Sequence, residues 1–73
     1  MKLAYDQETD SVYVNLRSGP AQDSREIAPD VVADFDAEGW LTGLDIQHAS
    51  TTIELDGIQI EGLTALAAIK RIA

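Results

Sequence analysis

Apolar and polar residues alternate with a period of two over the first fifty residues, which is typical of β-strands with one face exposed to water. The clearest strand is Ser11–Arg17, in which Val12, Val14 and Leu16 alternate with other residue types. Turn residues such as Ser18-Gly-Pro20 separate it from its neighbours. The same reasoning predicts further strands at 2–6, 24–28, 31–35 and 40–47. We therefore expect an antiparallel β-sheet meander of four or more strands.

The segment from Asp34 to Asp45 predicts a hairpin with a defined register. Its loop is expected at 36–39, where Gly39 tolerates the positive φ that such a turn requires. The resulting opposite pairs are Phe35 and Trp40, Ala33 and Thr42, Val31 and Leu44, Asp34 and Leu41, Val32 and Gly43, and Asp30 and Asp45. This register assigns Phe35 and Trp40 to the core. It also separates Asp34 from Asp45 by four rungs, or roughly 13 Å.

The pattern changes after Ala49. Alternation around Asp56-Gly57 predicts a second hairpin within 51–60, whereas Thr51 and Glu54 fit the capping box of a helix, so both structures stay open. Beyond Gly62, apolar residues recur at helical spacing and predict a C-terminal helix packed on one face of the sheet. These residues are Leu63, Leu66, Ala67, Ile69 and Ile72. The expected fold class is α+β, in a single domain over 1–73 with a sheet in 1–50 and an extension in 51–73.

The chain is short for a self-sufficient core. A domain of 73 residues buries only about 60–65% of the surface that its unfolded chain exposes. With no Cys there are no disulfides to help, so we expect a homo-oligomer. The N-terminus carries no secretory signal, and no apolar run approaches the ~20 residues that span a bilayer. We expect a cytoplasmic protein without membrane contact.

Acidic residues dominate the charge of the chain. Thirteen Asp and Glu against five Lys and Arg give a formal net charge of −8. Such a surface repels phosphate groups, so direct nucleic-acid binding is not expected. The acidity either serves solubility alone or attracts a basic protein partner by long-range steering.

The acidic turn is the one candidate for metal chemistry. Asp34, Asp36, Glu38 and Gly39 fall at positions one, three, five and six of the calcium-loop pattern, with Asp45 at position twelve. Three features argue against a calcium site. The flanking segments are strands, position twelve is Asp instead of a bidentate Glu, and Asp34 and Asp45 are roughly 13 Å apart. A small metal-binding or enzymatic accessory protein that uses Asp34, Asp36 and Glu38 is the alternative function.

Catalysis has little support in the sequence. A single histidine, His48, gives one base at most, there is no Cys, and no serine lies in a Gly-x-Ser-x-Gly motif. The glycines are spread as turn residues and form no phosphate loop. We therefore expect a protein that is not an enzyme and has no catalytic residue, cofactor or resident metal.

Polar side chains on the sheet are the better candidates for a site. Tyr13, Asn15 and Arg17 share the polar side of the clearest strand, and Tyr and Arg are favoured at interfaces. Together with Asp34 and Asp45 they are the candidate partner-binding residues. The alternative is an ordinary solvated sheet face.

An ordered set of motifs gives the chain a family resemblance. They are Tyr5-Asp6, Asp10-Ser-Val-Tyr-Val-Asn-Leu16, Glu26, Val31-Val-Ala-Asp-Phe-Asp36, Gly39 and Gly43-Leu-Asp-Ile-Gln-His-Ala-Ser50. Over residues 1 to about 50 the chain resembles the small acidic bacterial proteins called domain of unknown function 2283, with Asp45 where members commonly carry Glu. The resemblance implies a mostly antiparallel sheet and no established activity. Members are often encoded beside small proteins that look like toxins, which implies an antitoxin-like binding role.

Overall fold

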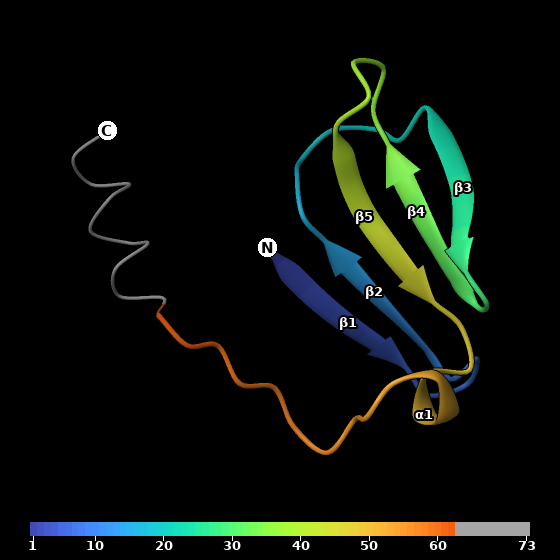
Figure 1. The fold of residues 1–73 in the computed structure, drawn as a ribbon, viewed down its shortest axis with the longest axis vertical. Coiled ribbons are helices and arrows are strands. Elements are labelled where there is room, and N and C mark those ends of the chain that lie inside the picture. Colours follow the sequence, from blue (N-terminus) through green and yellow to red (C-terminus); the bar gives the residue numbers. More distant parts are fainter. Residues whose placement is uncertain (63–73) are drawn as a thin grey trace.

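A single antiparallel sheet forms the body of the molecule (Figure 1). The computed structural model describes residues 1–62, so most of the predicted C-terminal helix, in 63–73, lies outside the described part. The elements are β1 (Lys2–Asp6), β2 (Ser11–Asn15), β3 (Asp23–Ala28), β4 (Val31–Phe35), β5 (Leu41–Ile46) and α1 (Ala49–Thr52). The expected antiparallel sheet of four or more strands is confirmed, with five.

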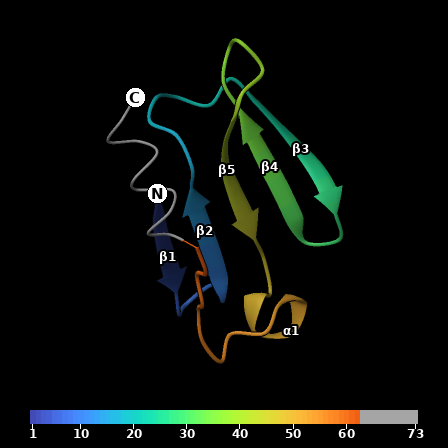
Figure 2. The ribbon, with the colours of Figure 1, turned by 60° about the vertical axis from the view of Figure 1, so that its left-hand side comes forward.

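The order of the strands differs from the predicted meander. It is β1-β2-β5-β4-β3, so β2 pairs with β5, and residues 16–22 carry the chain past one end of the sheet to its far edge (Figure 2). Strands β2 to β5 thus have the spatial order of a Greek key. The β2–β5 pairing places Val12 opposite Ile46 and Val14 opposite Leu44. Alternation and turn residues mark the strands, but they do not specify this long-range pairing.

The register divides the side chains between two faces, because directly paired residues in neighbouring strands point to the same side. What we call the apolar face carries Leu3, Tyr5, Val12, Val14, Val31, Ala33, Phe35, Leu44 and Ile46. What we call the polar face carries Tyr13, Asn15, Ser24, Glu26, Val32, Asp34, Gly43 and Asp45. All but two residues of the second group are polar or charged.

Little side-chain surface is fully enclosed within residues 1–62. The buried apolar residues are Val12, Ala33 and Ala49, and none of the described large side chains is completely buried. Leu3 and Tyr5 on the apolar face keep 43% and 53% of their surface exposed. The described part of the chain is therefore one sheet with an incompletely covered apolar face.

The turn between β4 and β5 has the expected loop. The Asp36 N–H donates to the Trp40 carbonyl at 2.9 Å, the Gly39 N–H donates to the Asp36 carbonyl at 3.0 Å, and Gly39 has φ 88°. The Asp36 carboxylate accepts hydrogen bonds from the backbone N–H of Glu38 at 3.0 Å and of Trp40 at 2.9 Å. Asp36 therefore stabilises the turn from within, as Asp commonly does.

The predicted register of this hairpin is wrong. Phe35 pairs with Leu41, Asp34 with Gly43, and Val32 with Asp45. An irregularity next to Phe35 lets β5 carry one extra residue against β4, which shifts the pairing beyond it. The shift is two residues from Gly43 to Ile46, so these residues keep their predicted faces, whereas Leu41 now pairs with Phe35 instead of Asp34. Asp34 and Asp45 are two rungs apart instead of four.

Trp40 is not a core residue. Its side chain is 58% exposed, and the Arg17 guanidinium lies 4.8 Å from the centre of its ring. The Phe35 ring carries the Arg25 guanidinium in the same way, at 4.1 Å. Both arginines thus cover aromatic surface by cation–π contact.

Neither structure predicted for 51–60 is present. The chain forms the single helical turn α1 directly after β5, with His48 as N-cap and Ile53 as C-cap, and residues 53–62 are irregular. Thr51 is therefore inside the helix and does not cap one. Ala49, which is completely buried, holds this turn at the end of the sheet.

Candidate functional site

A chain of hydrogen bonds crosses the polar face. The Tyr13 hydroxyl in β2 donates to the Asp34 carboxylate in β4 at 2.8 Å, and the Ser24 hydroxyl in β3 donates to the other oxygen of that carboxylate at 2.7 Å. The network joins β2, β4 and β3 and passes over β5, which lies between β2 and β4. Side-chain bonds of this kind hold the face in one arrangement.

Gly43 leaves the space through which the Tyr13 side chain reaches Asp34. The Tyr13 side chain passes over β5 at Gly43, so a Cβ there would collide with the phenol oxygen and lie 2.6 Å from Cζ. Any side chain at this position would displace the ring. The glycine is therefore required by the close approach of Tyr13, as strand-interior glycines often are.

The network keeps the Tyr13 hydroxyl protonated. Its hydrogen bond to Asp34 raises the pKa of Tyr13, and partial burial and the charges of Asp34 and Asp45 raise it further. The neutral phenol is the donor that the Asp34 carboxylate needs. Tyr13 is thus suited to hold Asp34 in place, and it is poorly suited to act as a base or nucleophile.

The structure brings together four of the five candidate residues. Asn15 and Asp34 lie in one row of the polar face, on either side of Gly43. Tyr13 and Asp45 are directly paired in the next row. Arg17 follows the end of β2 and lies on Trp40, away from this group.

Two members of the network were missed by the sequence analysis. Ser24 lies in a segment with a weak strand pattern, and its contact depends on the β3–β4 pairing. The predicted register places Gly43 opposite Val32, whereas it lies opposite Asp34 and beneath the Tyr13 ring. A glycine inside an otherwise regular strand indicates close approach of another group, and that signal could have found it.

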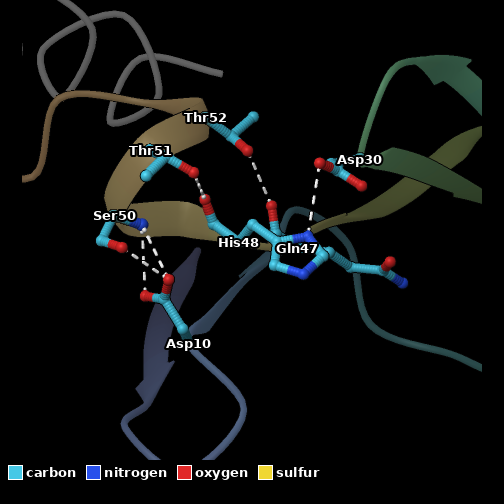
Figure 3. Close-up of polar contacts among 7 residues, drawn as sticks. All are labelled: Asp10, Asp30, Gln47, His48, Ser50, Thr51 and Thr52. Carbon is cyan, nitrogen blue, oxygen red and sulfur yellow. Dashed lines mark hydrogen bonds and ion pairs between the residues drawn. The ribbon is translucent and has the colours of Figure 1, made fainter.

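A second cluster joins the β1–β2 turn to α1 (Figure 3). The Asp10 carboxylate accepts a 2.6 Å hydrogen bond from the Ser50 hydroxyl and two longer ones from the Ser50 N–H, and the Tyr5 hydroxyl donates to it at 2.8 Å. The Asp10 carbonyl accepts from the Ala49 N–H at 2.8 Å. Asp10 itself has φ 51°, a conformation that Asp tolerates better than most residues. These bonds lower the pKa of Asp10, with Ser50 the larger cause and Tyr5 the next.

His48 and Asp30 meet at the same end of the sheet (Figure 3). The His48 Nδ1 lies 3.3 Å from the Asp30 carboxylate, and the Gln47 N–H donates to the Asp30 carbonyl at 2.8 Å. His48 and Asp30 both have positive φ, at 50° and 63°. The β3–β4 turn is thereby tied to the segment that follows β5.

Metal binding by the acidic turn gains no geometric support. Among residues 1–62 there is no group of three His, Asp or Glu side chains placed to hold a metal ion. Asp34 is occupied by Tyr13 and Ser24 on the polar face, whereas Asp36 binds the backbone of its own loop. The same described residues contain no helix long and apolar enough to cross a membrane.

These features define a small protein built on one five-stranded antiparallel sheet, with the single helical turn α1 in its described part. The chain belongs to the family described as protein of unknown function (DUF2283), whose model matches residues 2–50. The resemblance is confirmed over the predicted segment, and the match ends at Ser50, the residue that binds Asp10. No curated protein and no solved structure matches the chain.

The contact between Tyr13 and Gly43 gives a first prediction. We expect Gly43→Ala to destabilise the fold by about 1–3 kcal/mol, because the new methyl group overpacks the site under the phenol. The free energy of unfolding is measured by urea titration. Gly57→Ala is the matched control, since nothing lies within 4 Å of a Cβ at Gly57. In a Tyr13→Ala background the cost of Gly43→Ala should largely disappear; an equal cost in both backgrounds contradicts the collision.

Asp10 gives a prediction on pH. Its pKa in the folded protein lies below the ordinary value of 3.8, so its stabilising contribution is fully present above that value and is lost as the pH falls through the folded pKa. We expect Asp10→Asn to be less stable at neutral pH and to lose less stability than the wild type between about pH 5 and pH 2. Thermal unfolding followed across this range checks it. Asp56→Asn, which removes an exposed carboxylate, should lose stability with falling pH as steeply as the wild type. If Asp10→Asn also follows the wild-type pH dependence, Asp10 does not make this contribution.

Proposed function

We propose that this protein is a non-enzymatic binding module whose polar face captures a basic partner protein, in the manner of an antitoxin that engages a toxin. The observation that carries the proposal is the hydrogen-bond network of Tyr13, Asp34 and Ser24. It fixes a carboxylate-bearing surface before any partner arrives. A preorganised surface loses less conformational entropy on association, which favours affinity.

The distribution of charge supports a basic partner. All 13 acidic residues lie within 1–62, whereas only three basic residues do: Lys2, Arg17 and Arg25. Arg17 and Arg25 lie on aromatic rings, and Lys2 pairs with Asn15 at the edge of the sheet. The field of the described part is therefore strongly negative, which accelerates encounter with a positively charged protein.

The polar network also favours binding over catalysis. The Asp34 and Asp10 carboxylates each accept hydrogen bonds from two side-chain hydroxyls. The bonds to Asp10 lower its pKa, which makes its carboxylate a weaker base, and the bonds to Asp34 occupy both of its carboxylate oxygens. Both acids are better suited to structural anchoring than to proton transfer.

The charge proposal is tested with the product of the neighbouring gene, which the proposal expects to be a small basic protein. We expect a complex whose dissociation constant, measured by calorimetry, rises at least tenfold between 50 and 500 mM NaCl because salt screens the attraction. Glu26→Lys on the polar face should weaken binding about tenfold more than Asp56→Lys, which changes the net charge equally outside the sheet. No complex at micromolar concentrations, or equal effects of the two variants, would overturn the proposal.

We further propose that the C-terminal helix predicted from the sequence covers the apolar face. The described chain has an apolar groove there, about 390 Å³ in volume, whose lining includes Leu3, Tyr5, Val14, Ile46, Leu55 and Ile58. Residues 53–58 already form one wall of it, and the apolar residues Leu63, Leu66, Ile69 and Ile72 follow closely in the sequence. Burial of apolar surface is the driving force.

Substitutions within the C-terminal segment test this cover. Leu66→Asp should lower the midpoint of thermal unfolding by about 5 °C or more, since ~1 kcal/mol shifts a domain of this size by that amount. Thr64→Asp, which adds the same charge off the apolar stripe, should shift it much less. Equal midpoints for the two variants contradict the proposal. A second result would also contradict the proposal. If sedimentation shows a stable dimer that persists after deletion of 63–73, a second copy of the chain occupies the groove.

A further inference from the structure

A polar hollow lies at one end of the polar face, next to α1. It has a volume of about 400 Å³ and is lined by Thr9, Ser11, Asp45, Gln47 and His48. Ser11 comes from β2 and Asp45 from β5, which are paired strands, and Thr9 belongs to the β1–β2 turn. The hollow is within the size range of pockets that take small ligands or single side chains.

The lining is rich in hydrogen-bond acceptors. The Thr9 and Ser11 hydroxyls bond to each other at 2.7 Å, which leaves lone pairs on both oxygens. Asp45 contributes a half-buried carboxylate, with no side-chain hydrogen bond or ion pair to any other residue within 1–62, and Gln47 contributes an amide carbonyl. The His48 Nδ1 lies 3.3 Å from the Asp30 carboxylate, and the imidazole forms part of the wall of the hollow.

None of the three basic side chains within residues 1–62 lines this hollow. Lys2 pairs with Asn15 at the far end of β2, and the Arg17 and Arg25 guanidinium groups lie on Trp40 and Phe35. One carboxylate surrounded by neutral acceptors complements a planar cation with several N–H donors. Arginine presents five such donors in a fixed fork, whereas lysine is a point charge.

We infer that the hollow lined by Thr9, Ser11, Asp45, Gln47 and His48 binds an arginine side chain of the partner protein. Asp45 pairs with the guanidinium, and the hydroxyl and amide oxygens accept its remaining N–H groups. The inference rests on the proposed function for the source of the arginine. The site itself can be tested without the partner.

The probe is the peptide acetyl-Gly-Arg-Gly-amide, titrated into the full chain and followed by amide NMR shifts. We expect saturable shifts concentrated on the lining residues, with a dissociation constant in the millimolar range typical of one side chain. The same peptide with citrulline, which keeps the shape but loses the charge, should bind at least fivefold more weakly. Asp45→Asn should also weaken the arginine peptide at least fivefold, whereas Asp56→Asn should leave its affinity within twofold.

The inference is overturned if the citrulline and arginine peptides bind equally, or if the shifts spread evenly over the acidic surface. The peptide comparison uses the wild-type chain, so it holds even if Asp45→Asn fails to fold. Binding of the arginine peptide in the hollow without any complex with the basic protein would refute the proposed function and leave the site standing. A complex with the basic protein that Asp45→Asn does not weaken would refute the site alone.

Discussion

The pairing of β2 with β5 is the interaction on which the rest of the structure depends. It joins the β1–β2 hairpin to the β3–β4–β5 unit and places Val12 and Val14 against Ile46 and Leu44. The same pairing brings Tyr13 over Gly43, from where its hydroxyl reaches Asp34. One strand contact therefore sets both the apolar packing and the polar network, and a change in its register would lose both.

The two faces of the sheet divide the tasks of the protein. The apolar face is incompletely covered within residues 1–62, so the stability of the fold depends on what packs against this face. The polar face is already ordered by its own hydrogen bonds, in which Tyr13 of β2 and Ser24 of β3 hold the Asp34 carboxylate. The residues that require cover are therefore separate from the residues that the proposed partner would contact.

The sequence predicted the strands well because alternation is a local property of each segment. The strand order, the extra residue at Thr42 and the exposure of Trp40 were not predicted, since each depends on contacts between distant segments. Tyr13, Asp34 and Asp45 could be placed on one face from the pattern alone. Their partner Ser24 could not, because its role depends on which strand lies next to β4.

The bonds between Asp10 and Ser50 bear on how the chain is made. They join residues 40 positions apart, and the β2–β5 pairing joins residues 28 to 34 positions apart. Contacts of such long range form slowly because a large loop must close first. During synthesis the β1–β2 hairpin must therefore wait until Ser50 has left the ribosome, with its apolar side uncovered. In this interval the nascent chain is most exposed to aggregation and most dependent on early protection.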